Sequence, residues 1–132
     1  DNGYTKEEMK MVWETQKIFG DDSVMVNPTA VRVPVFYGHS EAIHLETRTP
    51  ISAEEVRSLM RHAPGVKLIE NEEDYPTPIS DSAGHDEVFV GRIREDISHA
   101  SGINMWVVGD NIRKGAATNS VQIAELLISD YL

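Results

Sequence analysis

The chain has 132 residues, 40% of them hydrophobic, which is the size and composition of one globular domain with a single core. Its 22 acidic residues against 12 Lys and Arg give a formal charge of −10, which argues against nucleic acid because a phosphate-binding surface usually needs a basic patch. Without cysteine these residues hold no disulfide, thiolate metal site or thiol nucleophile, and no apolar run approaches the roughly 18 residues of a membrane span. We therefore expect a cytoplasmic location with no nucleic-acid or membrane partner. The polar start lacks Met, which hints at a cut point inside a longer chain.

The first expected element is a helix over residues 5–19. Thr5 and Glu8 have the spacing of a capping box, which satisfies the free amides at a helix start. Gly20 and Asp21 then end the helix. Four apolar residues recur at helical spacing and should face the core: Met9, Val12, Trp13 and Phe19.

Alternation predicts two strands next, over residues 29–36 and 39–48, joined through a Tyr-Gly turn. Pro34 lacks an amide donor, so it belongs at an edge, a bulge or a strand end. A second helix begins at Ser52, where Glu55 completes another capping box, and it stops before Pro64 and Gly65.

The second half of the chain predicts three more strands and a helix. A short strand at 66–70 precedes the longest loop, 71–86, which by its length is more often functional or at an interface than idle. Strands are expected at 87–96 and 103–111, and a closing helix at about 113–131. The apolar stripe of that helix is Val121, Ala124, Ile128 and Tyr131.

This order predicts an α+β fold over residues 1–132, in which a mixed, largely antiparallel sheet is covered by helices. Hairpin-like neighbours alternate with helical crossovers, which does not match repeated βα units. No Gly-x-Gly-x-x-Gly follows a strand, so the chain holds no complete dinucleotide-binding half of its own.

Arg32 and His39 are the first candidate site residues. An Arg in a Val-rich strand must point away from the core, be paired, or bind an anion, and its planar fork suits a carboxylate or phosphate. His39 follows Gly38, where the backbone can be approached closely, and His titrates near physiological pH. The residues alone leave two plainer interpretations open: an acidic partner for Arg32 and a backbone bond for His39.

A polar stripe on the first helix and Asn111 near the last one are weaker candidates. The stripe consists of Glu7, Lys10, Glu14 and Lys17. As a solvated ladder, its ion pairs would be worth about 0.3 to 0.5 kcal/mol each, and the residues alone favour this interpretation. Asn111, at a helix start, indicates either capping or close approach to a ligand.

The histidines do not predict a metal site. His44, His62, His85 and His99 lack metal-ligand spacing. His39 and His44 are five residues apart, which places them on opposite faces of a strand.

Four segments together resemble the later part of bacterial aspartate-β-semialdehyde dehydrogenases. They are NGYTKEEMKMVWETQKI, TAVRVPVFYGHSEAI, DEVFVGRIREDI and VVGDNIRKGAATNSVQIAELL. The resemblance covers essentially the whole chain, and its most specific feature is E-x-x-K on the first helix followed by R-x6-H in the strand turn. It implies the fold of the C-terminal domain of glyceraldehyde-3-phosphate-dehydrogenase-type enzymes.

The resemblance also implies a reaction. Members of this family use NADPH to convert β-aspartyl phosphate to aspartate semialdehyde and phosphate, on the route to lysine, methionine, threonine and diaminopimelate. A thiolate attacks the acyl phosphate, phosphate leaves, hydride reduces the thioester, and a histidine handles the proton.

Carried over by resemblance, each candidate residue acquires a role. Glu7 would hold the substrate ammonium group and Lys10 the phosphate. Arg32 would grip the α-carboxylate, and His39 would be the acid/base. Asn111 would touch the nicotinamide end of the cofactor.

The chain departs from the family in what it lacks. The nucleophilic cysteine, a following glutamine, the phosphate-binding arginine and the nucleotide-binding domain that mainly holds NADP are missing. The resemblance thus implies the C-terminal portion of a longer enzyme, a homodimer or homotetramer, and we expect this portion alone to be inactive. The alternative is a non-catalytic dimerisation or interaction module. Core or interface residues are expected among Val88, Val90, Met105, Trp106 and Val107.

Overall fold

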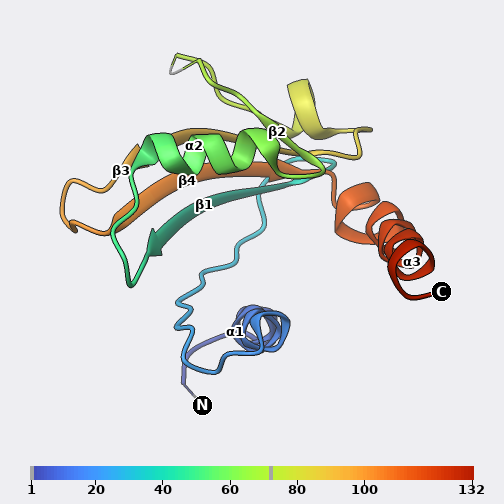
Figure 1. Cartoon of the computed structure of the whole chain (residues 1–132), viewed down its shortest axis with the longest axis horizontal. Helices are drawn as coiled ribbons and strands as arrows, with labels where there is room; N and C mark the ends of the chain where they lie inside the picture. Colours follow the sequence, from blue (N-terminus) through green and yellow to red (C-terminus); the bar gives the residue numbers. More distant parts are fainter. Residues whose placement is uncertain (1, 72) are drawn as a thin grey trace. The chain divides into compact units, whose positions relative to one another are not determined.

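The computed structural model describes residues 2–71 and 73–132, which form two compact units (Figure 1). The first unit ends at Pro34, and the second begins at Val35. The first contains one helix, and the second contains a four-stranded sheet with its helices. Each unit is described by itself below.

In the first unit, helix α1 spans Lys6–Phe19 and begins with the predicted capping box. The Thr5 hydroxyl accepts the Glu8 amide, and the Glu8 carboxylate accepts the Thr5 amide. Gly20 ends the helix in the left-handed region, with φ 63°, which a residue without Cβ adopts readily. Both predicted ends of this helix are confirmed.

Two predictions for this part of the chain are wrong. Residues 29–36 do not form a strand: Pro34 has no amide to donate, and the Ala30 amide is bonded to a side chain of α1 instead. Trp13 and Phe19 were expected to face a core, but they are 56% and 70% exposed. A unit with a single helix has no second layer to cover them.

The second unit is built on a sheet with strand order β1-β4-β3-β2. Strand β1 (His39–Glu46) is antiparallel to β4 (Gly102–Gly109), and β4 is antiparallel to β3 (Val88–Glu95). The short β2 (Val66–Leu68) is parallel to β3. The predicted mixed, largely antiparallel sheet is thus confirmed.

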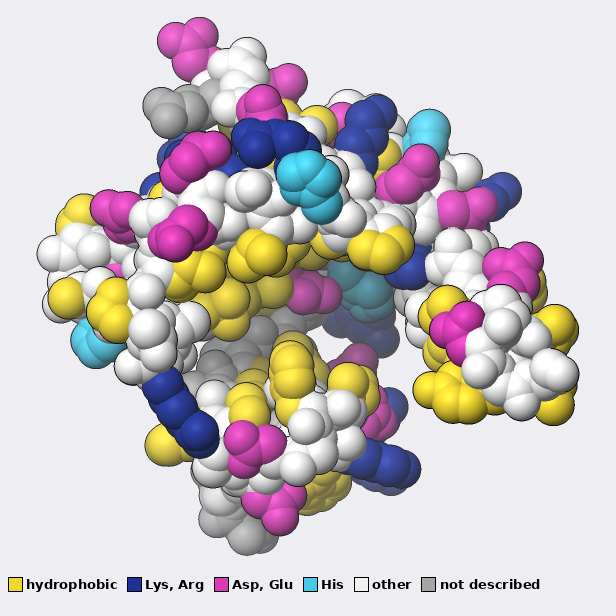
Figure 2. Space-filling model, in the orientation of Figure 1, with side chains coloured by type: hydrophobic (Ala, Val, Ile, Leu, Met, Phe, Trp, Pro, Cys, Tyr) yellow, Lys and Arg dark blue, Asp and Glu magenta, His cyan; other side chains and the backbone are white. Residues whose placement is uncertain are grey.

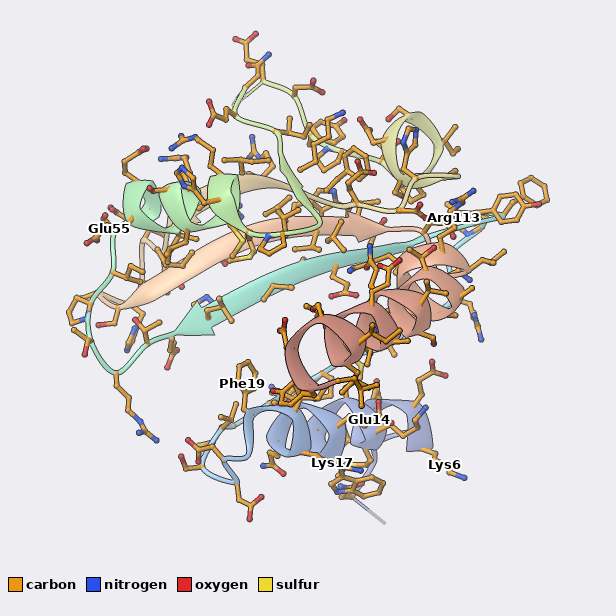
Figure 3. The ribbon with its side chains drawn as sticks, turned by 45° about the vertical axis from the view of Figure 1, so that its right-hand side comes forward. Lys6, Glu14, Lys17, Phe19, Glu55 and Arg113 are labelled. Atoms are coloured by element: carbon orange, nitrogen blue, oxygen red, sulfur yellow. The ribbon has the colours of Figure 1, made fainter. Side chains whose placement is uncertain are left out.

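Helix α2 (Ala53–His62) crosses one face of this sheet (Figure 1). It starts at N-cap Ser52 with the predicted capping box to Glu55, which Figure 3 labels in its first turn. The buried core lies between helix and sheet and consists of Ala53, Val56, Val90, Ile93, Ile103 and Met105. Val88 and Val107 pack against this core, whereas Trp106 points to the other face and donates from Nε1 to the Pro76 carbonyl at 2.8 Å.

Strand β3 is interrupted by a bulge. The pairing with β4 shifts register between Gly91 and Arg94, and Arg92 has a φ of 57°. Guanidinium groups satisfy the carbonyls released there: Arg94 Nη1 donates to the Arg92 carbonyl at 2.8 Å, and Arg57 Nη2 donates to the Ile93 carbonyl at 2.7 Å.

The remaining elements are short turns and the last helix. The π-helical turn η1 (Pro78–Ser82) lies in the long loop, and a second such turn, η2 (Arg113–Ala117), leads into helix α3 (Thr118–Tyr131). The closing helix is therefore confirmed, but its first turn is wider than an α-helix.

The apolar side chains of α3 are exposed, and Figure 2 shows hydrophobic side chains over this helix. Within the described ranges, no helix is long and apolar enough to cross a membrane.

Candidate functional site

Helix α1 carries Glu7 and Lys10 one turn apart, so both project from the same side of the helix. Lys10 Nζ lies 3.7 Å from Glu14 Oε1, and both side chains are more than half exposed. The structure thus contains one ion pair of the predicted ladder, and an exposed pair of this kind contributes little stability.

Glu8, beside these residues, is buried and connects the helix to the segment that leads to Arg32. Its Oε2 accepts the Thr5 amide at 2.7 Å, and its Oε1 accepts the Ala30 amide at 2.8 Å. These hydrogen bonds, first that from Ala30, lower the pKa of the Glu8 carboxyl below its ordinary value. The backbone two residues before Arg32 is therefore fastened to the first turn of α1.

A second bond supports the same segment. The Tyr4 hydroxyl donates to Asn27 Oδ1 at 2.6 Å. Arg32 itself is exposed and lies in a segment without regular secondary structure. The first unit thus holds three of the predicted site residues. Glu7 and Lys10 lie on one turn of α1, and Arg32 lies on the segment that is hydrogen-bonded to this helix.

His39 and Asn111 lie together at one end of the sheet. His39 is the first residue of β1 and pairs with Gly109, the last residue of β4. Two residues further on, Asn111 Oδ1 accepts the Gly38 amide at 2.8 Å. A hydrogen bond therefore joins Asn111 to the residue directly before His39, although the two are far apart in sequence.

Gly38 confirms the close backbone approach expected there. Its φ is 91°, and a Cβ at this position would lie 3.0 Å from Pro78 Cβ and 3.2 Å from the Gly109 carbonyl oxygen. Any other residue would be strained by its backbone angle and would press on η1. The Ser82 hydroxyl is buried on the same side and has no hydrogen-bond partner in the described part of the chain.

Two buried carboxylates, Glu8 and Asp110, were not singled out from the sequence as site residues. Asp110 follows β4 and accepts three backbone amides, those of Gly84, Ile112 and Arg113, which lower the pKa of its carboxyl. The signal that could have found it is an Asp between a strand and a helix start, a position where this side chain often binds nearby amides.

The predicted site residues fall into two groups. Glu7, Lys10 and Arg32 belong to the first unit, and His39 and Asn111 belong to the second. The meeting of the two groups in one pocket stays a prediction. Among residues 2–71 and 73–132, no group of three or more His, Cys, Asp or Glu is placed to hold a metal ion.

Comparison with known proteins defines the class. Residues 1–114 match the family model described as semialdehyde dehydrogenase, dimerisation domain, and the chain belongs to this family. Within it, the chain corresponds to the C-terminal portion of aspartate-semialdehyde dehydrogenases. It is 72% identical to the enzyme of that name from Shewanella violacea, over 99% of this chain and 39% of that relative.

Solved structures agree with this assignment. The crystal structure of aspartate semialdehyde dehydrogenase II complexed with ASA from Vibrio cholerae is 67% identical, with a TM-score of 0.95 over 100% of this chain and 39% of that one. Aspartate semialdehyde dehydrogenase with NADP from Candida albicans is 30% identical, with a TM-score of 0.71 over 96% and 43%. The expected fold of the glyceraldehyde-3-phosphate-dehydrogenase type is confirmed. The chain spans about 39% of the length of the first two relatives.

Proposed function

We propose that this chain is the substrate-binding and dimerisation part of an NADP-dependent aspartate-semialdehyde dehydrogenase. The enzyme would convert β-aspartyl phosphate to aspartate semialdehyde and phosphate, for the synthesis of lysine, methionine, threonine and diaminopimelate. The observation that carries this proposal is 72% identity over 99% of the chain to a relative of that name. The presence of Glu7, Lys10, Arg32 and His39 favours an enzyme over a non-catalytic module, because a binding surface alone does not need all four.

Each residue suits its proposed role chemically. The Glu7 carboxylate attracts the substrate ammonium group, and the Lys10 ammonium attracts the phosphate. Arg32 presents two parallel N–H donors to the α-carboxylate. His39 accepts and returns a proton at the reacting carbon's oxygen, a role for which an imidazole is suited near neutral pH. The nucleophilic thiolate belongs to the part of the enzyme outside this chain, so this chain alone should not turn over substrate.

The reduced cofactor, NADPH, would supply the hydride and would be held mainly by a nucleotide-binding domain outside this chain. The residue here that fits it is Asn111. Its Oδ1 is committed to the Gly38 amide, which fixes the side-chain plane and leaves the NH2 group as the donor. An amide NH2 donor is complementary to the carboxamide oxygen of a nicotinamide. The structure of a more distant relative contains NADP, which supports NADP as the cofactor of the proposed enzyme.

The proposed assembly is a homodimer or homotetramer. The description of the family as a dimerisation domain supports the association of two or more copies.

The expected cytoplasmic location also stays a prediction.

Arg32→Lys and His39→Asn test the two central roles in the full-length enzyme. Lysine keeps the charge but loses the bidentate fork, so kcat/KM for β-aspartyl phosphate should fall by about tenfold or more. His39→Asn should lower kcat and leave KM nearly unchanged, because proton transfer is lost while binding groups remain. Steady-state kinetics give both values.

Lys17→Gln is the matched control, since Lys17 lies on α1, the helix that carries Glu7 and Lys10, and has no proposed role. Its kinetics should match wild type. Unchanged kinetics in Arg32→Lys would remove Arg32 from the site, and a large rise in KM with normal kcat in His39→Asn would contradict its acid/base role.

A further inference from the structure

Asp110 is a buried carboxylate at the point where β4 leaves the sheet. It is 5% exposed. Its Oδ2 accepts the Gly84 amide at 2.8 Å, and its Oδ1 accepts the amides of Ile112 at 2.8 Å and Arg113 at 3.0 Å. The guanidinium of Arg113, which is labelled in Figure 3, is paired with Asp86 at 2.8 Å. A buried carboxylate is costly unless its oxygens are satisfied, and here backbone amides satisfy both.

These three bonds fix the backbone on both sides of Asn111. One oxygen of Asp110 holds the loop before β3, and the other holds the two residues that follow Asn111. The Asn111 side chain in turn accepts the Gly38 amide at 2.8 Å. Asp110 therefore holds the backbone that flanks Asn111, and the Asn111 side chain holds the residue before His39.

We propose that Asp110 is a positioning residue that sets the side chain of Asn111 and, through Gly38, the start of β1 at His39. This inference rests on the proposed function and deepens it, because both residues it positions belong to the proposed site. The backbone of Gly38 is also limited by its surroundings, since a Cβ there would lie 3.0 Å from Pro78 Cβ and 3.2 Å from the Gly109 carbonyl oxygen. The hydrogen bond to Asn111 is a separate constraint on Gly38, and Asp110 holds the backbone next to the residue that accepts it.

Asp110→Asn is the informative variant because it keeps the shape of the side chain. It replaces one acceptor oxygen by an NH2 group that faces an N–H donor, so either the Gly84 amide or the amides of Ile112 and Arg113 lose their acceptor. Asp86→Asn is the matched control. Asp86 belongs to the same region and holds Arg113 and Thr118, each at 2.8 Å, but it makes no bond next to Asn111.

The first experiment measures hydrogen exchange at the Gly38 amide in the full-length protein. Asp110→Asn and Asn111→Ala should each speed exchange by about tenfold or more, because both break the support of that amide. Asp86→Asn should leave it within about twofold of wild type. Asp110→Ala removes both acceptor oxygens, so unchanged protection in both Asp110→Asn and Asp110→Ala, or equal loss in Asp86→Asn, would overturn the proposal.

The second experiment measures kcat and KM for the same variants and for the double variant Asp110→Asn with Asn111→Ala. Each single variant should lower kcat about tenfold or more, and the double variant should be no slower than the slower single one, since Asp110 acts through Asn111. Asp86→Asn should keep kcat. Multiplying effects in the double variant would overturn the proposal. A wild-type protein without turnover would overturn the proposed function instead, and hydrogen exchange would still decide the role of Asp110.

Discussion

At the scale of single residues, the first unit depends on a carboxylate with two tasks. Glu8 completes the capping box of α1 and also accepts the Ala30 amide. One side chain thus caps the helix and also bonds the distant Ala30 amide. Both bonds need the ionised carboxylate, because each of its two oxygens accepts one amide. The depressed pKa of the Glu8 carboxyl follows from this arrangement.

Glu8→Gln should separate these tasks. Glutamine has one carbonyl oxygen, so it cannot accept the Thr5 and Ala30 amides at two oxygens. We expect the Ala30 amide to exchange about tenfold faster, as measured by hydrogen exchange of the full-length protein. Lys17→Gln, on the same helix and outside the cap, should leave the Ala30 amide protected. Equal exchange of the Ala30 amide in both variants would contradict the role of the Glu8–Ala30 hydrogen bond.

At the scale of elements, local sequence decides where the helices begin, whereas strands and bulges depend on the neighbouring strands they pair with. Both α1 and α2 start where Thr or Ser precedes Glu at the capping-box spacing, since that signal is contained within four residues. The expected strand at 29–36 failed because alternation predicts an extended backbone but cannot supply a neighbouring strand. The bulge at Arg92 was not predicted either, because only the register with β4 reveals it.

Ser52→Ala tests the cap of α2. Loss of the hydroxyl that accepts the Glu55 amide should lower the free energy of unfolding by about 1 kcal/mol, measured by urea denaturation. Ser52→Thr should recover most of this loss. Ser58→Ala, on the exposed middle of the same helix, should leave stability equal or slightly higher because Ala favours helix.

At the scale of the whole molecule, carboxylates held by hydrogen bonds make stability depend on pH. The pKa values of Glu8, Glu55, Asp81, Asp86, Asp96 and Asp110 all lie below their ordinary values. A carboxyl group whose folded pKa is lowered takes up protons more readily when unfolded. Its contribution is therefore complete above the unfolded pKa and is lost as the pH falls toward the folded pKa.

The free energy of unfolding should consequently fall as the pH drops below the ordinary values of 4.5 for Glu and 3.8 for Asp. Urea denaturation of the full-length protein between pH 7 and about pH 3 measures this. Asp110→Asn should be less stable at pH 7 and should lose less stability on acidification, because it lacks one of these groups. Parallel pH curves for the two proteins would exclude Asp110 as a contributor.

In the candidate site, too, the residues could be selected from nearby sequence, whereas the hydrogen bonds between distant segments could not. Residue types and spacing sufficed to select Glu7, Lys10, Arg32, His39 and Asn111 through a family resemblance. The hydrogen bond from Gly38 to Asn111 could not be predicted, because it joins positions 73 residues apart and depends on the pairing of β1 with β4. The hydrogen bond from the Gly84 amide to Asp110 was missed for the same reason, whereas the bonds of Asp110 to the Ile112 and Arg113 amides are local and a nearby sequence signal could have indicated them.

The position of β1 at one end of the strand order has a further consequence for solubility. Within the described part of the sheet, β1 pairs with β4 only, and the outer edge of an eight-residue strand is a place where another chain could add and start aggregation. Half of the residues of β1 are ionisable: His39, Glu41, His44 and Glu46. Two copies of β1 that met in parallel and in register would place each glutamate beside its own copy, so at neutral pH like charges would oppose that growth of the sheet.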